Sequence, residues 1–230
     1  MKKVIYLLVA MLSVSAVKAQ EVDFSLGSDI VSSYVWRGAY QTSAAIQPAM
    51  GLSVSGFSLS AWGSVPFQGE AKEVDFTASY EISGLSFAVT DYWALSEGAG
   101  KYFTYGSRRT AHLFEAAVDY ELPVERFPLS LSWNTMFTGS DYKLSDGKRA
   151  YSTYISASYP FSIKDVSLAA SIGATPWESA IYGDGFSIIS VGMKASKELK
   201  ITDSLSLPVF GEVITNPQTE DIFFVFGVSL

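Results

Sequence analysis

The sequence predicts an all-β protein whose chain forms one antiparallel β-barrel of about 12 strands. Three observations predict this fold. Apolar residues alternate with polar ones at period two along most of the chain, and the connections between these segments are short and long in turn. The composition is 48% hydrophobic but only 17% charged, which is too little charge to coat a soluble domain of 230 residues.

The alternation is clearest in segment 22–36. Even-numbered positions are mostly apolar, beginning with Val22, Phe24 and Leu26, whereas Asp23 and Ser25 stand between them. Successive side chains of a strand point to opposite faces, so this pattern predicts a strand with one apolar and one polar face. The pattern recurs over segments 50–54, 57–65, 74–82, 85–89, 114–120, 129–137, 151–159, 166–172, 189–193, 205–213 and 222–230.

The connections differ in length between the two ends of the predicted barrel. Ser55-Gly56 and Ser83-Gly84 fit two-residue hairpin turns. Connections at the opposite end are longer and cover 38–46, 66–72, 96–110, 138–149, 175–185 and 215–220. Short periplasmic turns and longer extracellular loops are typical of transmembrane β-barrels in bacterial outer membranes. One connection on the short side, 121–128, is longer than this rule expects.

Alternation alone does not say which face lines the barrel interior. The polar face carries small residues such as Ser58, Ser60 and Thr77 rather than the Lys and Glu of a soluble exterior. A barrel of about 12 strands exceeds the roughly eight strands that side chains can fill, so an apolar interior would leave a void. We therefore expect hydroxyl groups inside and lipid outside, with a soluble lipocalin-like barrel as the alternative. Aromatic girdles are then expected from Tyr34, Trp36, Trp93, Phe137, Tyr151 and Trp177 at the outer interface and from Phe57, Tyr120, Phe127, Tyr159 and Phe161 at the inner one.

The first residues predict a secretory signal peptide over 1–19. Lys2 and Lys3 precede the apolar run 4–12, and Val17 and Ala19 stand at positions −3 and −1 of a cleavage site. This run is shorter than the ~20 residues that a membrane-spanning helix needs. Cleavage leaves 13 of the 16 basic residues against 23 acidic ones, a net charge near −10, which argues against nucleic-acid binding.

Several short motifs lie between residues 28 and 92. They are Ser33-Tyr34-Val35-Trp36-Arg37-Gly38, then Gln41-Thr42, Gln47-Pro48, Gly56-Phe57, Ser60-Ala61-Trp62-Gly63-Ser64 and Glu73-Val74-Asp75. This stretch resembles the opening of the Gcw_chp family, also called TorF-type bacterial outer-membrane porins. The resemblance implies a secreted outer-membrane barrel and does not supply a solute.

Reactive side chains are scarce. The chain has no cysteine and one histidine, His112, which excludes cysteine nucleophiles and sites built from several histidines. His112 stands on the apolar face, as in outer-membrane phospholipases, but Phe114 occupies the position where such an enzyme has its serine. Segment 141–147 is only slightly similar to a calcium loop, because Lys143 and Leu144 interrupt the ligands. The sequence therefore predicts no enzyme, no cofactor and no metal site.

Charged residues on the predicted lumen face are the candidate functional residues. We expect Arg37 to form a cluster with carboxylates near the outer mouth, and an acidic lumen to favour cations over anions. The alternative is a structural network of ion pairs that fixes the strand register. The pore-lining candidates are Asp29, Arg37, Glu73, Asp75, Glu115 and Glu212.

Together these features predict a porin-like passive channel for small solutes. The first alternative is a plugged barrel whose outer loops, including the tyrosine-rich loop 101–108, form a structural or adhesive surface. A lipid hydrolase is the weaker alternative. The expected partners are outer-membrane lipids, the barrel-assembly machinery during insertion, and a small solute that the sequence does not identify.

Overall fold

The structure is a computed structural model that describes residues 22–69, 71–95, 100–106, 110–124, 127–203 and 205–230. The predicted signal peptide, 1–19, lies outside the described residues. No helix in the described part of the chain is both long enough and apolar enough to cross a membrane.

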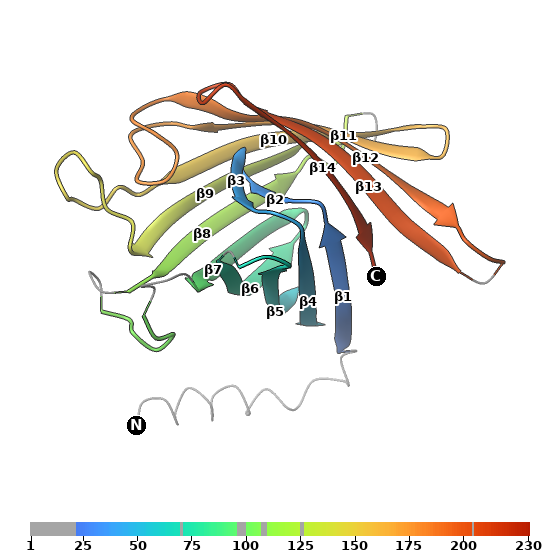
Figure 1. The fold of residues 1–230 in the computed structure, drawn as a ribbon, viewed down its shortest axis with the longest axis horizontal. Coiled ribbons are helices and arrows are strands. Elements are labelled where there is room, and N and C mark those ends of the chain that lie inside the picture. Colours follow the sequence, from blue (N-terminus) through green and yellow to red (C-terminus); the bar gives the residue numbers. More distant parts are fainter. Residues whose placement is uncertain (1–21, 70, 96–99, 107–109, 125–126, 204) are drawn as a thin grey trace.

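Twelve antiparallel strands form one closed barrel, which confirms the predicted fold (Figure 1). Consecutive strands are neighbours, and β1 closes the ring against β14. The strands have nine to fourteen residues, which meets or exceeds the length needed to cross a bilayer. They are β1 (Asp23–Val31), β4 (Ala45–Val54), β5 (Phe57–Pro66), β6 (Lys72–Ile82), β7 (Leu85–Leu95), β8 (His112–Glu121), β9 (Ser130–Gly139), β10 (Thr153–Ile163), β11 (Val166–Thr175), β12 (Ser187–Lys200), β13 (Ser206–Asn216) and β14 (Asp221–Ser229).

The two ends of the barrel differ in their connections. One end, the turn end, contains the connections 55–56, 83–84, 122–129, 164–165 and 201–205; the other, the loop end, contains 32–44, 67–71, 96–111, 140–152, 176–186 and 217–220. Both residues of each Ser-Gly turn have positive φ, 51° and 82° at Ser55 and Gly56 and 53° and 78° at Ser83 and Gly84. A two-residue turn of this kind matches the twist of the strands it joins.

The wall has an apolar outer face and a polar inner face. Inside, hydroxyl groups face one another across neighbouring strands: Ser60 lies opposite Thr77, and the Thr77 and Thr90 hydroxyls are 2.9 Å apart. Outside, large apolar side chains are exposed on almost every strand. They include Phe24, Leu26, Met50, Leu52, Leu59, Phe76, Phe87, Val89, Val118, Leu131, Trp133, Phe137, Ile172, Val191, Met193, Val213, Phe224 and Phe226. The alternation in the sequence thus sorts the side chains as expected.

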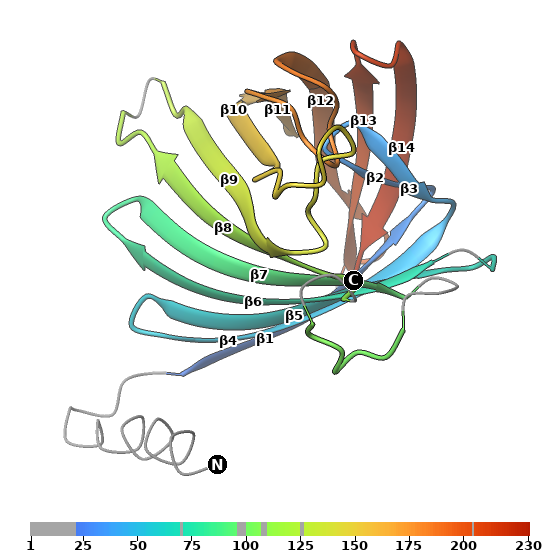
Figure 2. The ribbon, with the colours of Figure 1, turned by 90° about the vertical axis from the view of Figure 1, so that its left-hand side faces the viewer.

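A small hairpin was not expected from the sequence. The first predicted strand ran from 22 to 36, but β1 ends at Val31, which pairs with Ala45 of β4, so the ring closes without the segment between them. That segment forms β2 (Tyr34–Trp36) and β3 (Ala39–Thr42), which pair with each other. Figures 1 and 2 show this pair, in blue, inside the curve of the barrel strands. We call residues 34–42 the lumen hairpin.

Two expectations about individual side chains are therefore wrong. Tyr34 and Trp36 belong to the lumen hairpin and not to an outer girdle, because the chain leaves the wall after Val31. Ile189, expected on the outer face, is 1% exposed, because the register of β11 and β12 shifts there and leaves Ile189 without a partner residue on β11. Such a bulge lets one side chain turn to the other face of a strand.

Candidate functional site

The lumen hairpin is held by an arginine at its tip. The Arg37 guanidinium donates from Nη1 and Nη2 to the two carboxylate oxygens of Glu115 on β8, at 2.6 and 2.8 Å. Arg37 Nη1 also donates to the Tyr182 hydroxyl at 2.6 Å, and the Tyr92 hydroxyl donates to Glu115 at 2.8 Å. The two charged side chains are only 11% and 3% exposed. A two-pronged arginine–carboxylate pair fixes geometry as well as charge.

Aromatic rings enclose the Arg37 side chain. Its guanidinium carbon lies 4.5 Å from the centre of the Trp36 ring and 4.7 Å from that of Tyr154 on β10. Trp36 packs against Tyr92 and Tyr182, with ring centres 5.7 and 6.0 Å apart. Tyr154 in turn lies against Tyr182. These rings extend from the hairpin to β7, β10 and the 176–186 loop, so they connect the hairpin to the wall at this level of the lumen.

The turn of the hairpin fits against the far wall. Arg37 and Gly38 have φ values of 51° and 79°, which is a strained conformation for the arginine. The Gly38 backbone lies against the β12 bulge so closely that a Cβ atom on Gly38 would be 1.9 Å from the Ile189 carbonyl oxygen. Asn216 of β13 donates its side-chain amide to the Gly38 carbonyl at 3.2 Å. The hairpin thus crosses the lumen and contacts strands on both sides.

Buried apolar side chains line the wall at this level. Met136, Ile189, Ile214 and Val225 have 0 to 7% of their surface exposed. All four are on strands of the barrel. Together with the rings around Arg37, they form a packed layer in the half of the lumen nearest the loop end.

The lumen is more open toward the turn end. Many inward residues there are small and accessible, among them Ser25, Ser60 and Ser167. Lys194 lies opposite Glu212 on the neighbouring strand, and its ammonium group is 4.3 Å from the centre of the Phe210 ring. Hydroxyl groups and a few charges therefore line a vestibule beneath the hairpin.

The six predicted residues fall into three groups. Arg37 and Glu115 form the central ion pair. Glu73 and Asp75 lie on β6 near the hairpin, where Tyr34 is close to both. Asp29 lies elsewhere on the wall, opposite Gln47 of β4 and Ser229 of β14, and Glu212 lies lower, opposite Lys194. Among the described residues, Arg37 forms an ion pair with Glu115 and not with Glu73 or Asp75, and it reaches Glu115 from a hairpin and not from a strand.

Three tyrosines of the site were missed. Tyr92 shares its face of the strand with Thr90, and Tyr154 shares its face with Ser152 and Ser156. A large ring among hydroxyl side chains was the signal that could have identified both tyrosines as lumen residues. Tyr182 gave no such signal, because it belongs to a loop.

Two loops at the loop end are tied together. Lys143 and Ser145 of one loop donate to the carboxylate of Glu178 in the next, with the lysine at 3.1 Å. These donors lower the pKa of Glu178 below its usual value. The Ser152 hydroxyl donates to Asp141 and accepts from the Ser179 hydroxyl, which joins the bases of the same two loops.

His112 occupies a separate position on the outer wall. It is fully buried beneath loop 100–106, with Nδ1 2.6 Å from Asp91 and Nε2 2.6 Å from the backbone carbonyl of Tyr102. A carbonyl oxygen only accepts, so Nε2 carries a hydrogen and donates it. A hydrolase would need an unprotonated ring nitrogen as its base, but Nε2 is protonated and donates to the Tyr102 carbonyl. The Tyr102 hydroxyl also donates to Asp91, so the cluster fastens the loop to the wall.

Replacement of His112 by alanine is expected to make loop 100–106 more mobile and to abolish no lipid-hydrolase activity. The loss of two hydrogen bonds costs at least about 1.4 kcal/mol, so tryptic cleavage after the exposed Lys101 should become at least about tenfold faster. Limited proteolysis of the folded protein in detergent measures this, with Asp184→Ala in another loop as the control. Lipid deacylation by wild type that disappears in His112→Ala would instead identify an enzyme.

No protein-family model matches the sequence, and no curated protein is significantly similar to it.

Proposed function

We propose that the chain is a β-barrel of the bacterial outer membrane and a porin-like passive channel for small solutes. The two-faced wall of the closed barrel carries this proposal. In hydrocarbon every backbone N–H and C=O group must be paired within the protein, and a closed barrel meets that requirement. The exposed apolar residues of the outer face then contact lipid, and the hydroxyl groups of the inner face contact water.

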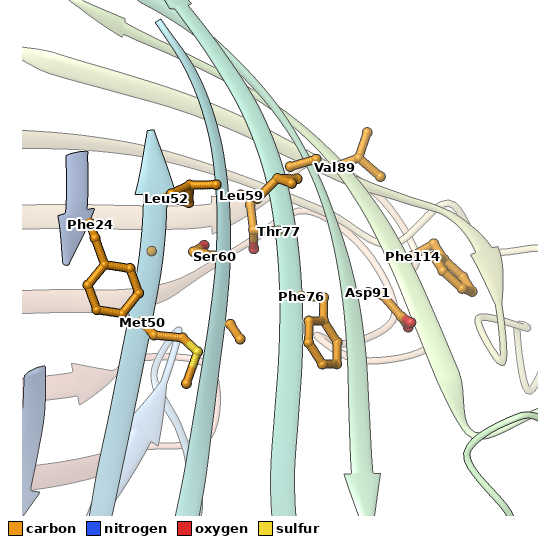
Figure 3. A pocket seen from close by; sticks show the side chains of 13 residues that line it. Phe24, Met50, Leu52, Leu59, Ser60, Phe76, Thr77, Val89, Asp91 and Phe114 are labelled. Atoms are coloured by element: carbon orange, nitrogen blue, oxygen red, sulfur yellow. The ribbon is translucent and has the colours of Figure 1, made fainter. Parts of the chain in front are cut away.

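A groove on the outer wall supports a lipid environment. Its volume is about 430 Å³, and apolar side chains from six neighbouring strands line it, among them Phe24, Met50, Leu59 and Phe76 (Figure 3). Phe24 and Met50 lie at one end of the view and Asp91 and Phe114 at the other. A large apolar groove is costly against water and favourable against acyl chains.

The direction of insertion follows from the connections. We place the turn end in the periplasm and the loop end outside the cell, as in other outer-membrane barrels. Export by a signal peptide over 1–19 and insertion by the barrel-assembly machinery belong to the same proposal. So does membership of the Gcw_chp or TorF-type porins, which rests on the motifs between residues 28 and 92.

Passage through the barrel depends on the lumen hairpin. A barrel of twelve strands encloses more space than one of roughly eight strands, whose interior the side chains fill. It encloses less space than a wide porin of sixteen strands. The hairpin occupies much of that space near the loop end, so only small solutes fit beside it. Glu73, Asp75 and Glu115 outnumber Arg37 there, which favours cations.

A sealed barrel is the second candidate. The observation that favours it is the dense packing around Arg37, whose hydrogen bonds, ion pair and ring contacts all tie the hairpin in place. In that case the outer loops carry the function, as a structural or adhesive surface.

Liposome swelling separates the two candidates. We expect vesicles that contain the purified protein to swell in glycine or arabinose and not in sucrose, because the hairpin limits the pore. Empty vesicles, and vesicles that contain the heat-denatured protein, are the controls. Absence of swelling in every solute, together with absence of ion conductance in planar bilayers, would establish the sealed barrel.

A further inference from the structure

A small cavity adjoins the lumen hairpin. Its volume is about 240 Å³, and its wall includes Trp36 and Gln41 from the hairpin, Glu73 from β6, Tyr92 from β7, and Tyr182. The remaining lining residues are apolar. Glu73 is thus the one charged residue in the described wall of the cavity.

The charges around this cavity do not balance. Arg37 is already bound to Glu115 through both of its terminal nitrogens. Within the described residues, no basic side chain forms an ion pair with Glu73 or Asp75. Two carboxylates on one face of β6 therefore share a partly buried place without a positive partner from the described chain.

Asp75 shows the imbalance most directly. It is 8% exposed, and its Oδ1 atom has no hydrogen-bond partner. Its neighbours across the sheet are Trp62 on β5 and Tyr92 on β7, and Tyr92 also lines the cavity. An unpaired buried carboxylate oxygen is costly. A positive charge bound in the adjoining cavity, beside Glu73, would offset that cost, although Asp75 does not itself line the cavity.

The surroundings distinguish between kinds of cation. Among the described residues, no group of three or more histidine, cysteine, aspartate or glutamate side chains is placed to hold a metal ion. Aromatic rings are abundant instead: Tyr34 packs on Trp62 at 5.3 Å, and Trp36 packs on Tyr92 at 5.7 Å. Carboxylates together with aromatic faces are the environment that binds alkylammonium groups.

We propose that this cavity binds a small alkylammonium ion, with Glu73 as its anionic partner and Tyr92 and Trp36 as its aromatic walls. Asp75, two residues further along the same face of β6, adds negative charge from outside the lining of the cavity. As the class of solute that the channel carries, this ion rests on the proposed function above. The charge of the ion would replace the missing counter-charge beside β6.

Binding can be measured on the full-length protein in detergent. Tetramethylammonium chloride is the probe, and quenching of tryptophan fluorescence and isothermal titration calorimetry are the readouts. Sodium chloride at equal ionic strength and neutral tert-butanol of similar size are the comparison ligands. We expect saturable binding of tetramethylammonium and none of the other two.

Two conservative variants test the carboxylates. Glu73→Gln should weaken binding at least about tenfold, which corresponds to 1.4 kcal/mol. Asp75→Asn should weaken binding less, because Asp75 does not line the cavity. Glu81→Gln is the matched control, because Glu81 lies on the same strand near the turn end. Heat-modifiable migration on a gel confirms that each variant is a folded barrel. Equal binding by all four proteins, or equal binding of tert-butanol, would overturn the proposal.

The binding experiment and the conductance experiment test the two proposals independently. Conductance without tetramethylammonium binding removes the cation site and leaves the channel. Binding without conductance or swelling removes the channel and leaves a ligand site in a sealed barrel.

Discussion

Replacement of Arg37 by methionine is expected to raise the ion conductance of the barrel several-fold and to increase its preference for cations. Hydrogen bonds from Arg37 hold the lumen hairpin to Glu115 and Tyr182. Without these hydrogen bonds the hairpin can move away from this position in the lumen. The Glu115 carboxylate, 3% exposed, is then left without its cation. Removal of one partner of a buried pair costs about 3–5 kcal/mol, which favours a rearrangement that hydrates the carboxylate.

Planar-bilayer recordings in a potassium chloride gradient measure both effects, because the reversal potential reports the selectivity. Lys148→Met is the matched control: this lysine is 82% exposed and paired with Asp146 in an outer loop, so conductance should not change. Arg37→Lys should be intermediate, since an ammonium group cannot donate to both carboxylate oxygens in the same fixed geometry. If the wild-type barrel is sealed, Arg37→Met should open it.

A double substitution separates the charge from the movement. In Arg37→Met/Glu115→Gln the hairpin has lost its ion pair, so conductance should stay high, while the cation preference should return toward that of wild type. Wild-type conductance and selectivity in both variants would mean that the pair serves strand register alone. The constriction would then have to lie elsewhere.

The wall of the barrel could be predicted from the sequence because its determinants are local. Period-two alternation places Ser60 and Thr77 inside and Phe76 outside, and the two Ser-Gly pairs provide the positive φ values of tight turns. The same parity placed Glu115 on the inner face. None of these conclusions depends on which strands face each other across the barrel.

The hairpin could not be predicted in the same way because its determinants are distant in sequence. Alternation continues past Val31 through Tyr34 and Trp36, so the sequence shows no break where β1 ends. The break comes from the pairing of Val31 with Ala45, and the place of the tip comes from the β12 bulge at Ile189. The Arg37-Gly38 turn was the one local signal, since glycine favours the positive φ that a two-residue turn requires.

Substitution of Gly38 by alanine is expected to open the lumen to larger solutes than wild type admits. The new Cβ atom would be 1.9 Å from the Ile189 carbonyl oxygen, and that oxygen belongs to the backbone of the wall and cannot turn aside. A φ of 79° adds about 1–2 kcal/mol of strain for any residue with a side chain. The tip of the hairpin therefore moves away from β12, and the Asn216 side chain loses its hydrogen bond to the Gly38 carbonyl.

Liposome swelling in a graded series of sugars measures the opening, and we expect sucrose to enter vesicles with Gly38→Ala. Gly185→Ala is the matched control, because a Cβ atom there meets nothing within 4 Å. A chain in which a short Gly-Ser linker replaces 34–42 gives the upper limit, since the pairing of β1 with β4 does not involve those residues. If the linker variant admits sucrose and Gly38→Ala behaves as wild type, the hairpin narrows the lumen but does not depend on contact with Ile189. If neither variant admits more than wild type, the packed layer of the wall itself sets the limit.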